Sequence, residues 1–80
     1  MTDIAMELQR LNPTEMRTAD DGCTTFLWYE NAARFVEVDV HTSGELCWNA
    51  RIGTNTQFGE SATRDGVPRF LRHCIEQVVQ

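Results

Sequence analysis

Two neighbouring segments in the middle of the chain alternate apolar and polar residues with a period of two. The apolar set consists of Val36, Val38 and Val40 in residues 35–41, and of Leu46, Trp48, Ala50 and Ile52 in residues 45–52. Successive side chains of a strand point to opposite faces of a sheet, so each segment is predicted to be a strand with one buried face. A one-residue slip would turn a whole apolar set toward solvent, so the pattern also restricts how the two strands pair.

The connection between these two strands is predicted from the same pattern. A three-residue loop at residues 42–44, with Gly44 in the left-handed conformation, pairs Val36 with Ala50, Val38 with Trp48 and Val40 with Leu46. A two-residue loop at residues 43–44 would pair Val40 with Cys47 and mix the two faces. We predict the three-residue loop, because it keeps the apolar residues together.

A third strand is predicted over residues 24–30, which are rich in β-branched and aromatic side chains. A loop at residues 31–33 pairs Trp28 with Val36 and Phe26 with Val38. Residues 53–66 are polar and contain three glycines, so they are predicted to be a loop. Residues 13–22 end in the turn signal Asp-Asp-Gly and are interpreted as either a short edge strand or a loop.

Apolar residues at helical spacing mark both ends of the chain. Near the start, Thr2 is the predicted cap of a short helix, Asp3 lies in its first turn and Pro13 ends it; the apolar positions are Ile4, Leu8 and Leu11. Near the end, Asp65 is the predicted cap and Pro68 lies in the first turn. The apolar positions of this second helix are Val67, Phe70, Leu71, Cys74, Ile75 and Val78.

The predicted fold class is α+β. The chain of 80 residues is long enough for one globular domain, residues 1–80. Its predicted order is an N-terminal helix, a three-stranded antiparallel β-meander and a C-terminal helix, with both helices packed on one face of the sheet. The opposite face is left for solvent or a partner, and carries Glu37, Asp39, Asn49 and Arg51.

The sequence predicts no metal, no cofactor and no membrane span. Its cysteines, Cys23, Cys47 and Cys74, are odd in number and widely spaced, so we expect three free thiols with Cys74 in the core. The glycines at positions 53, 59 and 66 do not match a phosphate-binding loop. The chain begins without the basic and apolar regions of a signal peptide, so a cytoplasmic location in a host bacterial cell is expected.

No group of residues in the sequence matches a catalytic arrangement, and we expect the protein not to be an enzyme. His41 and His73 have no acid at a suggestive spacing and are interpreted as solvated surface residues. The pairs Glu37–Asp39 and Asp20–Asp21 lack the regular oxygen spacing of a calcium loop. The catalytic, cofactor-binding and metal-binding sets are therefore predicted to be empty.

The charge of the chain points to the kind of partner it would bind. Its net charge is −5, and residues 1–48 alone hold nine acids against three arginines, a local charge of −6. An acidic protein repels nucleic acid and attracts basic surfaces, so direct binding of nucleic acid is not expected although Phe35, Arg34 and Arg51 lie near one another. The one local basic group, Arg69, Arg72 and His73, is interpreted as a solvated helix face.

The segments TTFLWYE and FVEVDVHTSGELCWNARI resemble a pattern found in small prophage and mobile-element proteins, over roughly residues 10–52. In size and charge the chain is also similar to type I anti-CRISPR proteins, those acting on type I-C complexes among them. This resemblance implies a non-enzymatic inhibitor that acts as a DNA mimic, binding an RNA-guided surveillance complex and blocking its target DNA. It supplies no binding motif that transfers residue by residue.

The predicted partner is a host protein or ribonucleoprotein complex with a basic, DNA-binding surface. The predicted partner-binding residues are acidic, each pairing with an Arg or Lys of the partner: Glu37, Asp39, Glu45, Glu30, Asp20 and Asp21. The alternative function is a small structural or oligomerising interaction module of a prophage or bacterium. Such a module would self-associate through the open sheet face or through an edge strand.

Overall fold

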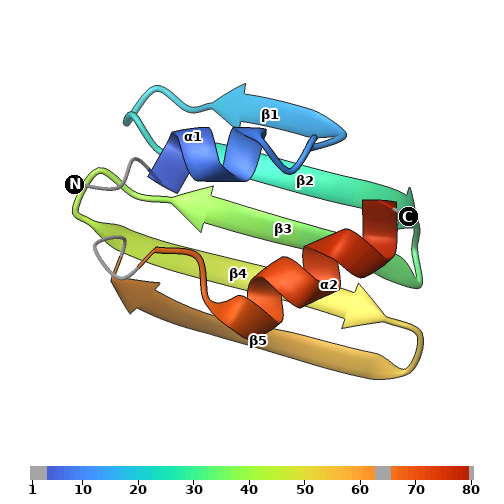
Figure 1. The fold of residues 1–80 in the computed structure, drawn as a ribbon. Coiled ribbons are helices and arrows are strands. Elements are labelled where there is room, and N and C mark those ends of the chain that lie inside the picture. The colour runs from blue at the N-terminus through green and yellow to red at the C-terminus, as the bar shows by residue number, and fades with distance from the viewer. Residues whose placement is uncertain (1–3, 63–65, 80) are drawn as a thin grey trace.

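The structure is a computed structural model that describes residues 4–62 and 66–79. The elements follow in the order α1 (Ile4–Gln9), β1 (Glu15–Thr18), β2 (Thr24–Asn31), β3 (Arg34–Val40), β4 (Glu45–Ile52), β5 (Asn55–Ala62) and α2 (Arg69–Val79). The strands form one antiparallel sheet in chain order, with both helices on the same face (Figure 1). The predicted helix caps Thr2 and Asp65, and the predicted first-turn residue Asp3, lie outside the described residues.

The predicted three-stranded sheet is wrong, because the sheet has five strands. The segment expected to be a loop contains β5, which pairs with β4 along its whole length from Asn55 to Ala62. The turn between them contains Gly53, whose φ of 66° lies in the left-handed region that glycine adopts readily. The segment left open between strand and loop contains β1. Both additional strands lie at edges of the sheet and lack an apolar alternation, since little of either is buried.

The predicted registers of the central strands are confirmed. Val36 pairs with Ala50, Val38 with Trp48 and Val40 with Leu46, as the three-residue loop requires. On the other side of β3, Trp28 pairs with Val36 and Phe26 with Val38. The register shifts between Tyr29 and Asn31, and Asn31 belongs to β2 where a loop residue was expected.

The core lies between the sheet and the two helices. Its buried residues are Ile4 and Leu8 of α1, Phe26, Trp28, Val36, Val38, Leu46 and Ala50 of the sheet, and Leu71, Ile75 and Val78 of α2. Trp28 is fully buried, and its indole Nε1–H donates to the carbonyl oxygen of Leu11 at 2.9 Å. This bond ties the segment after α1 to the sheet. Helix α2 begins at Arg69, after Pro68, and packs on β2, β3 and β4.

The position of Gly59 within β5 has a packing reason. It lies opposite Trp48 in the sheet, and a Cβ at this position would approach Cζ2 of the Trp48 ring to 2.7 Å. The Trp48 ring in turn packs edge-on against Phe70 of α2, with ring centroids 5.3 Å apart. The absence of a side chain at Gly59 therefore makes room for the aromatic contact between the sheet and α2.

We expect Gly59→Ala to lower the free energy of unfolding by about 1–3 kcal/mol, since the added methyl group overpacks against the Trp48 ring. Urea unfolding of the wild type and the variant measures this change. In a Trp48→Leu background, Gly59→Ala should lower the free energy of unfolding much less, because the indole ring that the added methyl group meets is absent. An equal cost in both backgrounds would contradict this account of Gly59.

Candidate functional site

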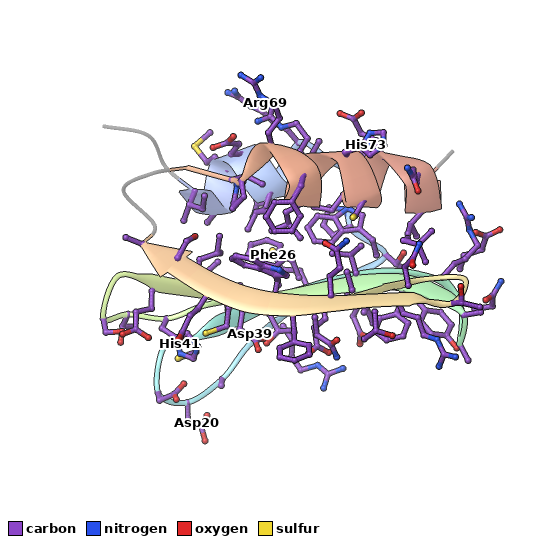
Figure 2. The ribbon with its side chains drawn as sticks, turned by 90° about the horizontal axis from the view of Figure 1, so that it is seen from below. Asp20, Phe26, Asp39, His41, Arg69 and His73 are labelled. Carbon is purple, nitrogen blue, oxygen red and sulfur yellow. The ribbon has the colours of Figure 1, made fainter. Side chains whose placement is uncertain are left out.

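The candidate site is the open face, defined as the face of the sheet turned away from α1 and α2. Figure 2 shows Asp39 and His41 on this side, while Arg69 and His73 project outward from the helix layer. Its side chains alternate along each strand with those of the core. The face has two distinct ends, one aromatic and one acidic.

The aromatic end is formed by Tyr29 and Phe35, and Leu27 and Phe58 lie in the next row of the sheet, which also contains Glu37. The rings of Tyr29 and Phe35 are cross-strand neighbours that stack with centroids 6.4 Å apart. Tyr29 is 49% exposed and Phe58 is 80% exposed, although both are large apolar side chains. Arg51 lies opposite Phe35 on β4. Exposed aromatic groups beside an arginine are typical of protein-binding surfaces.

The acidic end follows one row across three strands. Asp39 of β3 lies opposite Cys47 of β4, which lies opposite Glu60 of β5. Glu45 is two residues from Cys47 on the same face. The Thr25 hydroxyl donates to Asp39 Oδ1 at 2.6 Å, and this contact fixes the orientation of the carboxylate.

The structure brings together three of the six predicted partner-binding residues. Glu37, Asp39 and Glu45 lie on the open face. Glu30 instead pairs with Arg34, with Oε2 2.7 Å from Nε, and Arg34 also donates to the Gln77 carbonyl oxygen of α2. Glu30 therefore belongs to the helix side of the sheet, as the alternation of β2 requires for a residue two positions after the buried Trp28.

The remaining two predicted residues, Asp20 and Asp21, lie in the exposed turn between β1 and β2. The Asp21 carboxylate accepts a hydrogen bond from the backbone N–H of Cys23 at 3.0 Å. This bond is the main cause that lowers the pKa of Asp21, with a smaller contribution from His41. The turn adjoins the acidic end, because Cys23 contacts His41.

Sequence reasoning missed three residues of the open face and one contact at its rim. Glu15, Phe58 and Glu60 lie in the two edge strands that the sequence did not assign. The contact joins Cys23 Sγ to His41 Nδ1 at 3.3 Å. His41 was interpreted as a solvated surface residue, yet it is half-buried. Extending the predicted pairing of Trp28 with Val36 to the ends of both strands places Cys23 beside His41, so the signal was present.

The three cysteines are free, as expected, and they lie in different surroundings. Partial burial raises the pKa of the Cys47 thiol, and the carboxylates of Glu60, Glu45 and Asp39 raise it further. Burial alone raises the pKa of the Cys74 thiol, which packs against the core without being fully enclosed. Cys23 is the cysteine whose sulfur contacts an imidazole.

Two features could hold a ligand by geometry. Ligand atoms of Glu45, Cys47 and Glu60 lie within 4.8 Å of one another, but exposed acidic groups often gather in this way without an ion. A shallow hollow of about 180 Å³ lies among Glu15, Arg17, Thr25, Leu27 and Glu37. It is smaller than the roughly 300 Å³ at which ligand pockets begin. This hollow of the open face therefore encloses little space for a small molecule.

No protein-family model, curated protein or solved structure matches the chain. No helix in the described residues is long and apolar enough to cross a membrane. The resemblance to anti-CRISPR proteins thus stays a prediction.

We expect Glu60→Gln to lower the pKa of Cys47, because it removes one of the negative charges that disfavour the thiolate. More thiolate is then present at about pH 8, and alkylation of Cys47 by iodoacetamide should accelerate by up to about fivefold. Glu76→Gln on α2 removes the same charge at a distance and serves as the control. Equal Cys47 rates in the two variants would contradict this effect of Glu60.

Proposed function

We propose that this chain is a binding protein that docks its open face on a basic protein surface and thereby excludes nucleic acid from that surface. The observation that carries the proposal is the segregation of charge between the two sides of the sheet. The open face holds five carboxylates against two arginines, namely Glu15, Glu37, Asp39, Glu45 and Glu60 against Arg17 and Arg51. On the helix side, the described residues hold Arg10, Arg34, Arg69 and Arg72 against Glu7, Glu30 and Glu76.

Most carboxylates of the open face are outside the ion pairs of the described residues and are available to a partner. The ion pairs among described residues join Arg17 to Glu15, Arg34 to Glu30 and Arg72 to Glu7. Glu37, Asp39 and Glu60 are in none of these pairs. A partner that brings Arg or Lys to this face therefore gains pairing without first breaking ion pairs within the chain.

The aromatic end supports a protein partner over nucleic acid. Aromatic side chains on a small sheet can stack on bases, but phosphate contacts dominate nucleic-acid affinity. Four carboxylates of β3, β4 and β5 share the face with Phe35 and Phe58 and would repel a phosphate backbone. An interface with a protein can instead use both ends, since apolar contact at the centre and charge at the rim are its usual composition.

The resemblance to type I anti-CRISPR proteins names one basic surface to test. Such guide complexes hold nucleic acid in positively charged channels, which an acidic face can occupy. Inhibition then requires no chemistry from the bound chain, since occupancy alone keeps target DNA out. The function proposed is accordingly non-enzymatic inhibition by competition.

We expect the wild-type chain to displace target DNA from a purified type I guide complex in a gel-shift competition at about 0.1 M salt, and to do so poorly at about 0.5 M salt. Glu37→Lys should weaken this competition by about tenfold or more, because it places a positive charge against a positive surface. Glu76→Lys changes the net charge equally on the opposite side and should compete like the wild type. If both variants lose competition equally, the effect comes from net charge. If Glu37→Lys competes as well as the wild type, the open face is not the binding surface.

A second candidate function, self-association, is favoured by the exposed edge of β5. This strand has eight residues with a single charge, Glu60, and no Pro or Lys, and its Phe58 is largely exposed. The other edge, β1, has only four residues, follows Pro13 and carries a Glu15–Arg17 pair. Short length, charge and proline are the features that protect edges from pairing, and β5 has few of them.

If β5 pairs with a second copy, light scattering after size exclusion should give a dimer mass at about 1 mM, and Phe58→Lys should return the mass to that of the monomer. Thr14→Lys near the β1 edge serves as the control for added charge. A monomer mass for the wild type at that concentration would remove this candidate.

A further inference from the structure

Cys23 and His41 form a thiol–imidazole pair from segments that are distant in sequence. Cys23 directly precedes β2 and His41 directly follows β3, and the antiparallel pairing of Thr24 with Val40 brings the two together. Their atoms Sγ and Nδ1 are 3.3 Å apart. Figure 2 shows His41 at one end of the sheet, on the open side. A nucleophile within hydrogen-bond reach of a base is the arrangement that activates cysteines.

The backbone on both sides of the pair is held in place. The N–H of Cys23 donates to Asp21 Oδ1 at 3.0 Å, and Ala19 accepts from Gly22 within the same turn. The N–H of His41 donates to the Glu45 carbonyl oxygen at 2.9 Å. The backbone positions from which the two reacting groups extend are thus held by the turn and by the β3–β4 hairpin.

We propose that Cys23 is the reactive thiol of this chain, that His41 accepts its proton, and that the site exchanges with small uncharged disulfides. The inference is independent of the proposed function.

The exchange balances without a further reactant. Imidazole Nδ1 takes the proton of the Cys23 thiol, and the resulting thiolate attacks one sulfur of a disulfide R–S–S–R. The Cys23–S–S–R bond forms as the original S–S bond breaks, and the leaving thiolate takes the proton from His41. The Cys23 sulfur is oxidised while the leaving sulfur is reduced.

The surroundings of the pair select the class of disulfide. Asp21 lies in the turn that carries Cys23, and Glu45 lies on the strand beside His41. Negative charge at both positions opposes the approach of an anionic disulfide. An uncharged disulfide meets no such electrostatic repulsion. Because Cys23 is half-buried, a small disulfide reaches it more readily than a large one.

Cys47 and Cys74 provide internal controls. The sulfur of Cys47 lies 3.9 Å from a Glu60 oxygen, and its pKa is raised by burial and by the neighbouring carboxylates. The pKa of Cys74, a residue of α2, is raised by its burial against the core. Neither thiol has an imidazole in hydrogen-bond contact among the described residues. Folding should slow both of them relative to the unfolded chain, where all three cysteines are alike.

The test is reaction with dipyridyl disulfide, an uncharged probe, at about pH 7, with each modified cysteine assigned by mass spectrometry in the folded chain and in urea. We expect folded Cys23 to react about tenfold faster than Cys47 and Cys74, and faster than it does in the unfolded chain. Folding can only decrease the accessibility of a thiol. A faster reaction of Cys23 in the folded chain than in urea therefore indicates that the fold activates it. A folded Cys23 that reacts more slowly than unfolded Cys23 would overturn the proposal.

The variant His41→Asn separates the role of the imidazole from that of the fold. It should slow Cys23 by about fivefold or more, while continued protection of Cys47 and Cys74 shows that the variant is folded. His73→Asn is the matched control, since His73 lies on α2 and contacts Gln77. An unchanged Cys23 rate in folded His41→Asn would likewise overturn the proposal.

Discussion

The antiparallel register of β2, β3 and β4 is the constraint on which the rest of the molecule depends. It places Trp28, Val36 and Ala50 in one row under the helices. The same register turns Glu37, Asp39 and Cys47 to the other side, because side chains alternate along every strand. Core and candidate site are therefore two consequences of one pairing, and a slip by one residue would exchange them.

The parts of the fold that bury apolar side chains could be predicted from the sequence, and the parts that bury few could not. The strand pairings of the two central hairpins followed from matching valines to apolar partners, although Asn31 was predicted to be in a loop and belongs to β2. The edge strands were not assigned from the sequence, because apolar residues alternate only where one face of a strand is buried. Strand β1 is exposed at every position. In β5 the residue facing Trp48 is a glycine, since the indole occupies the space of a side chain. Because of this glycine, the sequence of β5 lacks the apolar alternation typical of a strand and was predicted to be a loop.

The candidate site was predictable to the same degree. Glu37, Asp39 and Glu45 were placed on one face by alternation, which needs only the strand and its register. Glu30 was grouped with the acidic residues of the open face although the alternation of β2 already places it on the side of Phe26 and Trp28. Glu60 was missed together with its strand. The contact of Cys23 with His41 was implied by the correct register and needed only to be followed to the ends of the strands.

The distribution of charge is difficult to explain by folding alone. Like charges on adjacent strands are destabilising, yet Asp39 and Glu60 flank Cys47 in one row and Glu45 lies beside it. Among the described residues, four of the six arginines lie on the helix side of the sheet, namely Arg10, Arg34, Arg69 and Arg72. Acidic residues that served only solubility would gain by being interspersed with cations. Carboxylates that remain concentrated on one face, beside exposed aromatic rings, repel one another, and a basic partner would relieve this repulsion on binding, which is the physical basis for proposing recognition at the open face.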